Sequence, residues 1–323
     1  MENLVTVFGG SGFVGTQAVR VLAKAGWRVR VAVRNPNLAY DMRLLGDVGQ
    51  IDVVQANIRV KASLVRALEN AAASLNLVGV LSETGRQGFQ AVHVMGARNV
   101  AEAAREQGVQ RVVQMSALGA AADSESKYAR TKAEGEAAVR EIHPDAAIVR
   151  PSVIFGPGDG LFERFASMAQ FSPVLPLIGG GDTRFQPVFV GDVGRALARI
   201  VTDLDSAGQT FELGGAGVYS FRELMEMLLA ETGQRRLLLP IPFPAAAALG
   251  SLGDLLSFAV RPPITADQVE LLKSDNVVSG GFPGLAELGI MPTTLEAVLP
   301  TYLYKYRKGG QYADQEARAL ARL

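Results

Sequence analysis

The sequence predicts an α/β fold, in which a doubly wound parallel sheet is followed by a smaller, mixed C-terminal lobe. Two observations lead to this prediction. Within residues 1–150, short β-rich runs alternate with helical stretches, which is the pattern of a parallel sheet with crossover helices. After about Pro151 the composition shifts toward Gly, Pro and large apolar residues, and the alternation ends.

The expected strands form one sheet, because each crossover between parallel strands is right-handed. They are 4–8, 28–33, 51–56, 74–80, 111–116 and 146–149. The expected helices between them are 13–25, 61–69, 87–107 and 124–141. We therefore expect a first domain over residues 1–155, with returning segments to about residue 235, and a smaller lobe over residues 156–323.

Two segments of the second lobe have helical character. Residues 221–232 have the apolar spacing of an amphipathic helix, and Gly233 is placed to end it. Residues 243–259 are strongly apolar but contain Gly250, Gly253 and Asp254, so the run is too broken and too short for a membrane span. It is either a core helix or a helix that lies against a partner or a membrane surface.

The composition excludes several classes of function. Of the 323 residues 48% are hydrophobic, enough for a sizeable core, and 32 basic residues balance 32 acidic ones. This balance gives no electrostatic argument for binding nucleic acid or an anionic membrane. The absence of Cys excludes disulfides and thiolate chemistry, and two His do not make a conventional zinc site, so we expect no metal. We expect a soluble protein.

A glycine-rich turn follows the first expected strand. Residues 9–15 read Gly-Gly-Ser-Gly-Phe-Val-Gly and open the first expected helix. At such a turn Gly9, Gly12 and Gly15 permit the tight bend, the close approach of a pyrophosphate and tight helix packing. The motif predicts a Rossmann-type domain that binds a dinucleotide, and a turn without a ligand is the alternative.

The second expected strand ends in Arg34, where a domain that prefers NAD usually places an acid for the ribose 2′-hydroxyl. A guanidinium at this place can hold a 2′-phosphate through charge-assisted hydrogen bonds. We therefore expect NADPH rather than NADH, unless Arg34 is only a solvated surface residue.

A second motif lies in the expected helix 124–141, where Tyr128 and Lys132 stand four residues apart and share one face. With Ser116 at the end of the fifth expected strand, they resemble the short-chain dehydrogenase/reductase superfamily. The resemblance implies that Lys132 holds the nicotinamide ribose and lowers the pKa of the phenol, Tyr128 transfers a proton and Ser116 polarises a carbonyl. These residues are catalytic only if the site turns over, because they can also hold a cofactor without reacting.

Two later segments resemble the extended branch of that superfamily. Residues 150–157, Arg-Pro-Ser-Val-Ile-Phe-Gly-Pro, are similar to the segment that passes the nicotinamide, and residues 189–195 contain the later Val-x-Asp-Val pattern. The resemblance places Pro151 beside the nicotinamide. The third expected strand departs from the pattern, because Asn57 stands where the superfamily usually carries an Asp that contacts adenine.

Within that branch the chain resembles the NADPH-binding accessory subunits of respiratory complex I, the NADH:ubiquinone oxidoreductase. The segment 262–276 weighs most, because it lies outside the nucleotide fold and ordinary reductases have no reason to share it; the other matching segments are 9–15, 76–79, 128–136 and 150–156. The resemblance implies pyrophosphate contacts from Gly9, Ser11, Gly12, Phe13 and Gly15, a 2′-phosphate contact from Arg34, and nicotinamide contacts from Asn76, Ser116, Tyr128, Lys132 and Pro151.

The same resemblance implies a subunit without turnover of its own, which holds NADPH as a structural ligand and supports assembly or stability of the peripheral arm. Its partners would be other subunits near the membrane, facing the tail of the second lobe, with a contact to lipid or to the membrane surface through residues 243–260. It would lie on the cytoplasmic face of the inner (plasma) membrane in a bacterium, or on the matrix face in a mitochondrion. A free NADPH-dependent reductase or epimerase and an NADP(H) redox sensor remain alternatives.

Overall fold

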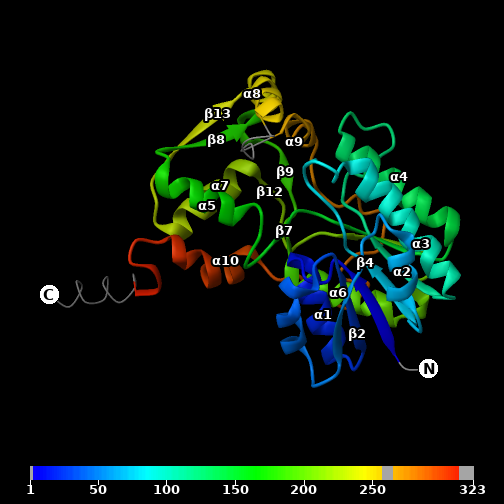
Figure 1. Ribbon diagram of the computed structural model, residues 1–323. Coiled ribbons are helices and arrows are strands. Elements are labelled where there is room, and N and C mark those ends of the chain that lie inside the picture. Colours follow the sequence, from blue (N-terminus) through cyan, green and yellow to red (C-terminus); the bar gives the residue numbers. More distant parts are fainter. Residues whose placement is uncertain (1–2, 257–264, 313–323) are drawn as a thin grey trace.

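The computed structural model of the chain describes residues 3–256 and 265–312 (Figure 1). Its main element is a seven-stranded sheet with the order β11-β6-β5-β4-β1-β2-β3, in which every neighbouring pair is parallel. This confirms the predicted α/β fold class. The strands are β1 (Leu4–Phe8), β2 (Arg28–Val33), β3 (Ile51–Gln55), β4 (Ala73–Asn76), β5 (Arg111–Met115), β6 (Ala147–Pro151) and β11 (Thr210–Leu213).

The strand order reverses between β1 and β4, because the chain builds outward from β1 to β3 and then returns to build outward on the other side. In such sheets ligands bind at this reversal, outside the carboxyl ends of the strands. Phe8 pairs with Asn76 at that edge, so the residues that follow each of them lie next to one another. The fold alone therefore marks the place of the site.

Helices cover both faces of the sheet. One face packs against α1 (Phe13–Lys24) and α6 (Val190–Thr202), whose apolar residues join those of β1 and β2 in one core cluster. On the other face, α2 (Lys61–Leu68), α3 (Met95–Glu106) and α4 (Lys127–Ile142) contribute to a second cluster around Leu64, Val100 and Val139. Each sheet face is thus buried, as an all-parallel sheet requires.

The second lobe has a core of its own, which includes Phe162, Leu175, Leu224 and Leu299. Its helices are α5 (Phe162–Phe171), α7 (Phe221–Thr232) and α10 (Leu295–Leu303). Three strand pairs complete it: β7 (Ile154–Phe155) with β10 (Val188–Phe189), β8 (Val174–Ile178) with β13 (Leu237–Ile241), and β9 (Arg184–Phe185) with β12 (Tyr219–Ser220). The expected division of the chain near residue 155 stays a prediction.

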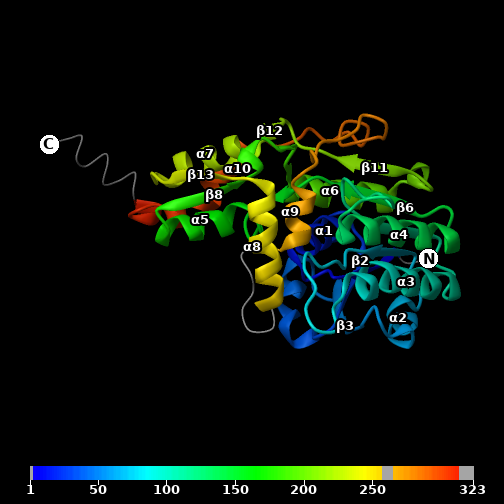
Figure 2. The ribbon, with the colours of Figure 1, turned by 90° about the horizontal axis from the view of Figure 1, so that it is seen from above.

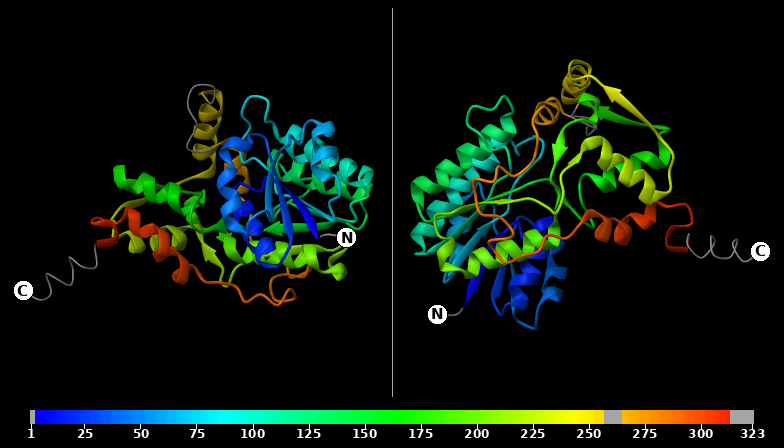
Figure 3. Two further views of the ribbon diagram at one scale, coloured as in Figure 1. Left: turned by 60° about the horizontal axis from the view of Figure 1, so that its bottom comes forward. Right: turned by 180° about the vertical axis from the view of Figure 1, so that it is seen from behind.

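Two further helices, α8 (Phe243–Leu256) and α9 (Ala266–Leu271), lie side by side at the border between the lobes (Figure 2). After α9 the chain runs back over the first domain and then returns to α10 (Figure 3). On this path Leu285 and Ile290 join the core of the first domain, and the backbone N–H and hydroxyl of Thr293 donate to the buried Asp192 carboxylate. The two lobes are therefore tied together by a long crossing segment.

Several sequence expectations change in the structure. The expected six-strand sheet has a seventh strand, β11, whose four residues pair with β6 but are too few to carry a recognisable pattern. The fourth strand ends at Asn76 rather than at residue 80, because the Asn76 side chain accepts a hydrogen bond from the Val78 N–H and turns the chain. The expected helix 87–107 begins with a π-helical turn, η3 (Gln90–Val94), before α3.

The helix expected at 221–232 is confirmed as α7, with Ser220 and Glu223 forming a capping box and Gly233 in the left-handed region at its end. The apolar run expected at 243–259 contains α8, and residues 257–259 lie outside the described residues, as do residues 262–264 and 313–323. Within the ranges 3–256 and 265–312, no helix has the length and apolar character needed to cross a membrane.

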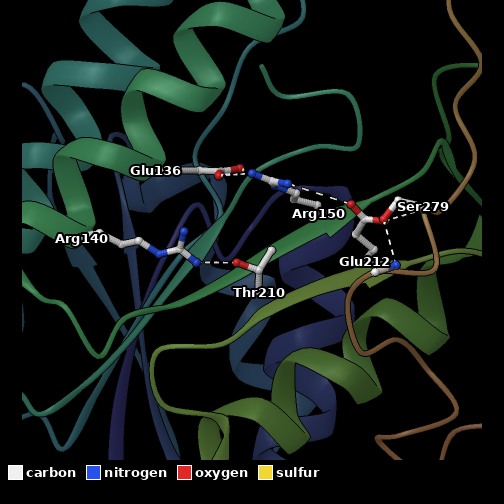
Figure 4. Close-up of polar contacts among 7 residues, drawn as sticks. Glu136, Arg140, Arg150, Thr210, Glu212 and Ser279 are labelled. Carbon is white, nitrogen blue, oxygen red and sulfur yellow. Dashed lines mark hydrogen bonds and ion pairs between the residues drawn. The ribbon is translucent and has the colours of Figure 1, made fainter. Parts of the chain in front are cut away.

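A buried chain of charges connects α4, β6 and β11 with the crossing segment (Figure 4). The Arg150 guanidinium donates two hydrogen bonds to the Glu136 carboxylate, at 2.8 and 2.6 Å, and its other side lies 3.9 Å from Glu212. The second oxygen of Glu212 accepts a hydrogen bond of 2.7 Å from the Ser279 N–H. One arginine therefore holds two carboxylates from separate elements.

We expect Arg150→Ala to lower the free energy of unfolding by about 3–5 kcal/mol, because Glu136 and Glu212, whose side chains are 6% and 7% exposed, lose their cation. Arg43→Ala is the control. Its ion pair with Asp52 has side chains that are 54% and 64% exposed, so its loss should cost at most about 1 kcal/mol. Urea unfolding of the two variants measures the difference, and equal costs would contradict a structural role for the Arg150 pairs.

Candidate functional site

The turn between β1 and α1 forms one half of the candidate site. The chain leaves β1 at Phe8 and enters Gly9 with a φ of +76°, a conformation that side chains rarely adopt. Gly12 then stands at the N-cap of α1 in an extended conformation. Gly12 has no side chain to cap the helix, so the N–H groups of the first turn, which carry a partial positive charge, are left without a side-chain cap from this residue. Ser11 is exposed there, and Phe13 is half-buried.

The glycines of this turn have different physical roles. A Cβ at Gly15 would lie 2.4 Å from the Gly9 carbonyl oxygen and 2.5 Å from that of Gly10, so the fold itself excludes a side chain. A Cβ at Gly12 would meet only the Gly9 oxygen, at 3.3 Å. A Cβ at position 12 is therefore a tight fit that a shift of a few tenths of an ångström would relieve, whereas an anion that approaches the start of α1 leaves no room for it.

The residues expected to contact the adenosine part of the nucleotide follow the carboxyl ends of β2 and β3. Arg34 follows β2 with an exposed side chain, and its backbone oxygen accepts a hydrogen bond of 3.4 Å from Gln55. Asn57 follows β3, but its side-chain oxygen accepts from the Arg59 N–H at 3.1 Å, and its own N–H donates to Ser63. The side-chain carbonyl of Asn57 thus stabilises the turn before α2. The expected contact of Asn57 with adenine stays a prediction.

The other half of the site lies at the ends of β4 and β5. Asn76 is buried, and its amide donates to the Gln114 side-chain oxygen at 2.8 Å. Ser116 is also buried, and its hydroxyl has no hydrogen-bond partner among the residues that the structure describes. Buried hydroxyls are almost always paired, so this group fits a ligand that supplies the partner.

Two further predicted residues border Ser116. The Lys132 ammonium is buried and lies 3.4 Å from the Met115 carbonyl oxygen, one residue before Ser116. Pro151 ends β6, and its carbonyl oxygen accepts a hydrogen bond of 3.0 Å from the Leu118 N–H. The structure therefore brings Asn76, Ser116, Lys132 and Pro151 to one edge of the sheet.

The charge states of the Tyr128 and Lys132 pair follow from their burial. Burial raises the pKa of the Tyr128 phenol to about 12, and the Asp267 carboxylate adds to this rise. Burial also lowers the pKa of the Lys132 ammonium to about 8, which the Glu136 carboxylate partly opposes. The Lys132 ammonium lies 5.8 Å from the centre of the Tyr128 ring, and its expected effect on the phenol pKa stays a prediction.

A residue that the sequence reasoning missed lies under Tyr128. The His93 ring meets the Tyr128 ring edge-on at 5.3 Å and stacks on Phe89. Its Nε2 accepts a hydrogen bond from the Val80 N–H, which places the proton on Nδ1, where it is donated to the Thr131 hydroxyl. Burial lowers the pKa of His93 to about 3, so it is neutral at physiological pH. No sequence pattern marked it.

Asp267 is the second missed residue. Its carboxylate accepts hydrogen bonds from the Ser126 hydroxyl at 3.0 Å, from the Lys127 N–H at 2.6 Å and from the Tyr128 N–H at 3.1 Å. These donors form the N-terminus of α4. Asp267 lies in the segment 262–276, which carries part of the sequence resemblance, but its contact with α4 depends on tertiary structure.

The comparisons with known proteins agree with this geometry. The model of the NAD dependent epimerase/dehydratase family matches residues 5–214. Proteins named NADH dehydrogenase (ubiquinone) 1 alpha subcomplex subunit 9, mitochondrial, are similar over most of their length: 34% identity over 95% of this chain and 79% of the protein in Arabidopsis thaliana, and 35% over 94% and 80% in Mus musculus. A protein named ceramide reductase from Caulobacter vibrioides is 33% identical over 81% of each chain.

Among solved structures, an NADPH-dependent quinone oxidoreductase of Escherichia coli, complexed with NADPH, aligns with a TM-score of 0.71. The alignment covers 91% of this chain and 97% of that one, at 24% sequence identity. At this identity the likeness shows the fold alone.

Substitution of the two glycines should separate folding from binding. Gly12→Ala should fold with a free energy of unfolding within about 1 kcal/mol of the wild type. It should nevertheless lose nucleotide affinity, because the added methyl group blocks the start of α1. Gly15→Ala should unfold at much lower urea concentration whether or not nucleotide is present, since its Cβ meets two backbone carbonyls. Urea unfolding and nucleotide titration measure both effects, and full binding by Gly12→Ala would refute this location of the pyrophosphate.

Proposed function

The chain belongs to the NAD dependent epimerase/dehydratase family, and we propose that within it the chain is an accessory subunit of respiratory complex I that holds NADPH as a structural ligand. The whole-length similarity to mitochondrial complex I subunits supports this proposal, because it covers both lobes rather than the nucleotide fold alone. The subunit would support assembly or stability of the peripheral arm without turnover of its own.

The similarity to complex I subunits carries the proposal, and the setting of Tyr128 is compatible with it. A general acid or base works best when its pKa lies near the operating pH. Burial and the Asp267 carboxylate instead raise the pKa of the phenol to about 12, which moves it further from neutral pH. The ring also packs against His93 and Phe89. These contacts suit a side chain that binds and packs more than one that exchanges a proton.

The proposed nucleotide fits the residues at the reversal of the sheet. Gly9, Ser11, Gly12, Phe13 and Gly15 would hold the pyrophosphate, and the unpaired Ser116 hydroxyl would find a partner in the nicotinamide half, beside Asn76, Tyr128, Lys132 and Pro151. Arg34 would hold the 2′-phosphate, which selects NADPH over NADH. A ligand that binds only the folded state stabilises it by about 4 kcal/mol at a thousandfold excess over its dissociation constant.

The proposed partners are other complex I subunits where the peripheral arm meets the membrane. The subunit would lie on the cytoplasmic face of the inner (plasma) membrane in a bacterium, or on the matrix face in a mitochondrion. Residues 243–260 remain the proposed contact with lipid or a partner. The exposed Leu237 and Leu239 of β13, next to the start of α8, would extend that apolar surface.

A free NADPH-dependent reductase is the second candidate, and one specific observation favours it. The similarity to a protein named ceramide reductase covers 81% of the chain. In that case Ser116 would polarise a carbonyl, Tyr128 would transfer the proton and Lys132 would hold the ribose. The unpaired Ser116 hydroxyl is compatible with this chemistry as well.

We expect Arg34→Ala to weaken NADPH binding about tenfold or more while NADH binding changes little, because only NADPH loses a charge-assisted contact. Calorimetric titration of each nucleotide measures the ratio. Arg98→Ala is the control, since Arg98 pairs with Glu141 on the helices away from this edge of the sheet. A similar loss for both nucleotides would remove Arg34 from the 2′-phosphate site.

The two candidate functions predict opposite results for Tyr128→Phe. In a complex I subunit this variant should leave subunit retention and quinone reduction by the purified complex nearly unchanged, because the ring still packs. In a free reductase it should lower turnover by about 10²–10⁴-fold while nucleotide binding survives. The measurement compares copurification with the membrane-bound NADH:quinone oxidoreductase and NADPH oxidation with a panel of carbonyl compounds. Turnover that needs Tyr128, in a protein that never associates with that complex, would refute the subunit proposal.

A further inference from the structure

The segment 265–276, here called the α9 segment, contacts both lobes although it belongs to neither nucleotide-binding half. At its start Asp267 holds the N-terminus of α4, and Gln268 reaches the Leu81 carbonyl oxygen at 3.4 Å in the chain that follows β4. At its end Asp275 accepts a hydrogen bond of 2.8 Å from the Arg184 N–H, and Asn276 accepts one of 2.9 Å from the Val153 N–H. The segment thus has separate attachments at its two ends.

Asp267 supplies a negative charge that the first turn of α4 does not contain itself. The first turn of α4 reads Lys-Tyr-Ala-Arg and contains no acidic residue. A carboxylate at a helix N-terminus is stabilised by the exposed N–H groups and by the helix dipole. Here it comes from a residue 139 positions after Tyr128, and it accepts three hydrogen bonds, one of which is from the Tyr128 N–H itself.

The position of the Tyr128 ring therefore depends on Asp267. The Tyr128 N–H donates a hydrogen bond to the Asp267 carboxylate, and Lys132 follows one helical turn later on the same face. Lys132 in turn lies against the Met115 carbonyl, next to the unpaired Ser116 hydroxyl. A shift of the first turn of α4 would move these groups relative to Ser116. Within the described part of the chain, the Asp267 carboxylate has its hydrogen bonds to α4 and none to the turn at Gly9 to Gly15.

We propose that Asp267 is a positioning residue for the nicotinamide half of the nucleotide site. By holding the first turn of α4 it sets Tyr128 and Lys132, and it couples occupation of that half to docking of the α9 segment. This inference rests on the proposed binding of NADPH. Coupling of this kind is reciprocal, so nucleotide in the nicotinamide half stabilises the α9 segment to the same degree that the segment favours the nucleotide.

The test compares two ligands that share the adenosine half. NADPH fills both halves, whereas 2′,5′-ADP carries the adenosine and the 2′-phosphate without the nicotinamide. Asp267→Asn keeps the size of the side chain but removes its charge, and an amide NH₂ then faces N–H and O–H donors. We expect this variant to bind NADPH at least about tenfold more weakly, with 2′,5′-ADP affinity nearly unchanged. Asp267→Glu, which keeps the anion, should recover part of the loss.

The matched control is Asp275→Asn, the same chemical change at the other end of the α9 segment. Its side-chain oxygen can still accept from the Arg184 N–H, so the affinities for both ligands should stay at wild-type values. Hydrogen exchange of the α9 amides gives the reciprocal measurement. NADPH should slow this exchange in the wild type and in Asp275→Asn, but much less in Asp267→Asn.

The outcomes separate this inference from the proposed function. If the wild type binds neither ligand, the proposed nucleotide function fails, and the inference fails with it. If the wild type binds both and Asp267→Asn loses affinity for both equally, or for neither, only the positioning role is overturned. Should Asp267→Asn fail to fold, Ser126→Ala removes one of the three donors, and the same selective loss of NADPH affinity, smaller in size, is expected. An unselective result from Ser126→Ala would overturn the proposal.

Discussion

The placement of α4 on the sheet is the constraint on which the candidate site depends, because this helix carries both Tyr128 and Lys132. Asp267 holds its N-terminus through three hydrogen bonds. In its middle, a Cβ on Gly135 would lie 2.2 Å from the His93 carbonyl oxygen, so only glycine permits the observed approach. Arg150 of β6 donates a hydrogen bond to each carboxylate oxygen of the neighbouring Glu136. The helix is thus fixed along its length by elements from three parts of the chain.

The part of the fold that the sequence predicts well is the part that depends on local signals. Runs such as residues 28–33 are short, carry Val at every second position and lie next to helical stretches, so the periodic signal is local and the strands can be found from it. The glycine turn is recognised for the same reason, since the need for small residues is set by backbone atoms within the same turn. The prediction of a doubly wound sheet followed by a smaller lobe, and of a glycine turn that opens the first helix, follows from these local signals.

Three features that the sequence did not predict are consequences of tertiary contacts. Strand β11 is a strand because Phe211 pairs beside Val149, a partner more than sixty positions earlier, and its four residues carry no periodicity of their own. In the sequence His93 is an isolated histidine. In the structure its ring forms hydrogen bonds with the Thr131 hydroxyl of α4 and with the Val80 N–H, which follows β4. The raised pKa of Tyr128 has the same origin, because the burial and the Asp267 carboxylate that cause it come from distant segments.

A Tyr-x-x-x-Lys pair on a nucleotide-binding fold is usually taken as a sign of turnover, but here the backbone and ring of Tyr128 and the ammonium of Lys132 also have structural contacts that need no reaction. The Tyr128 N–H donates to Asp267, and its ring packs against His93 and Phe89. The Lys132 ammonium lies near both the Met115 carbonyl and the Tyr128 ring. Only the phenolic hydroxyl lacks such a role, and the buried setting that gives the ring its contacts is what keeps that hydroxyl protonated. A proton donor must carry its proton before it reacts, so the environment that packs the Tyr128 ring also preserves the proton that a donor would need.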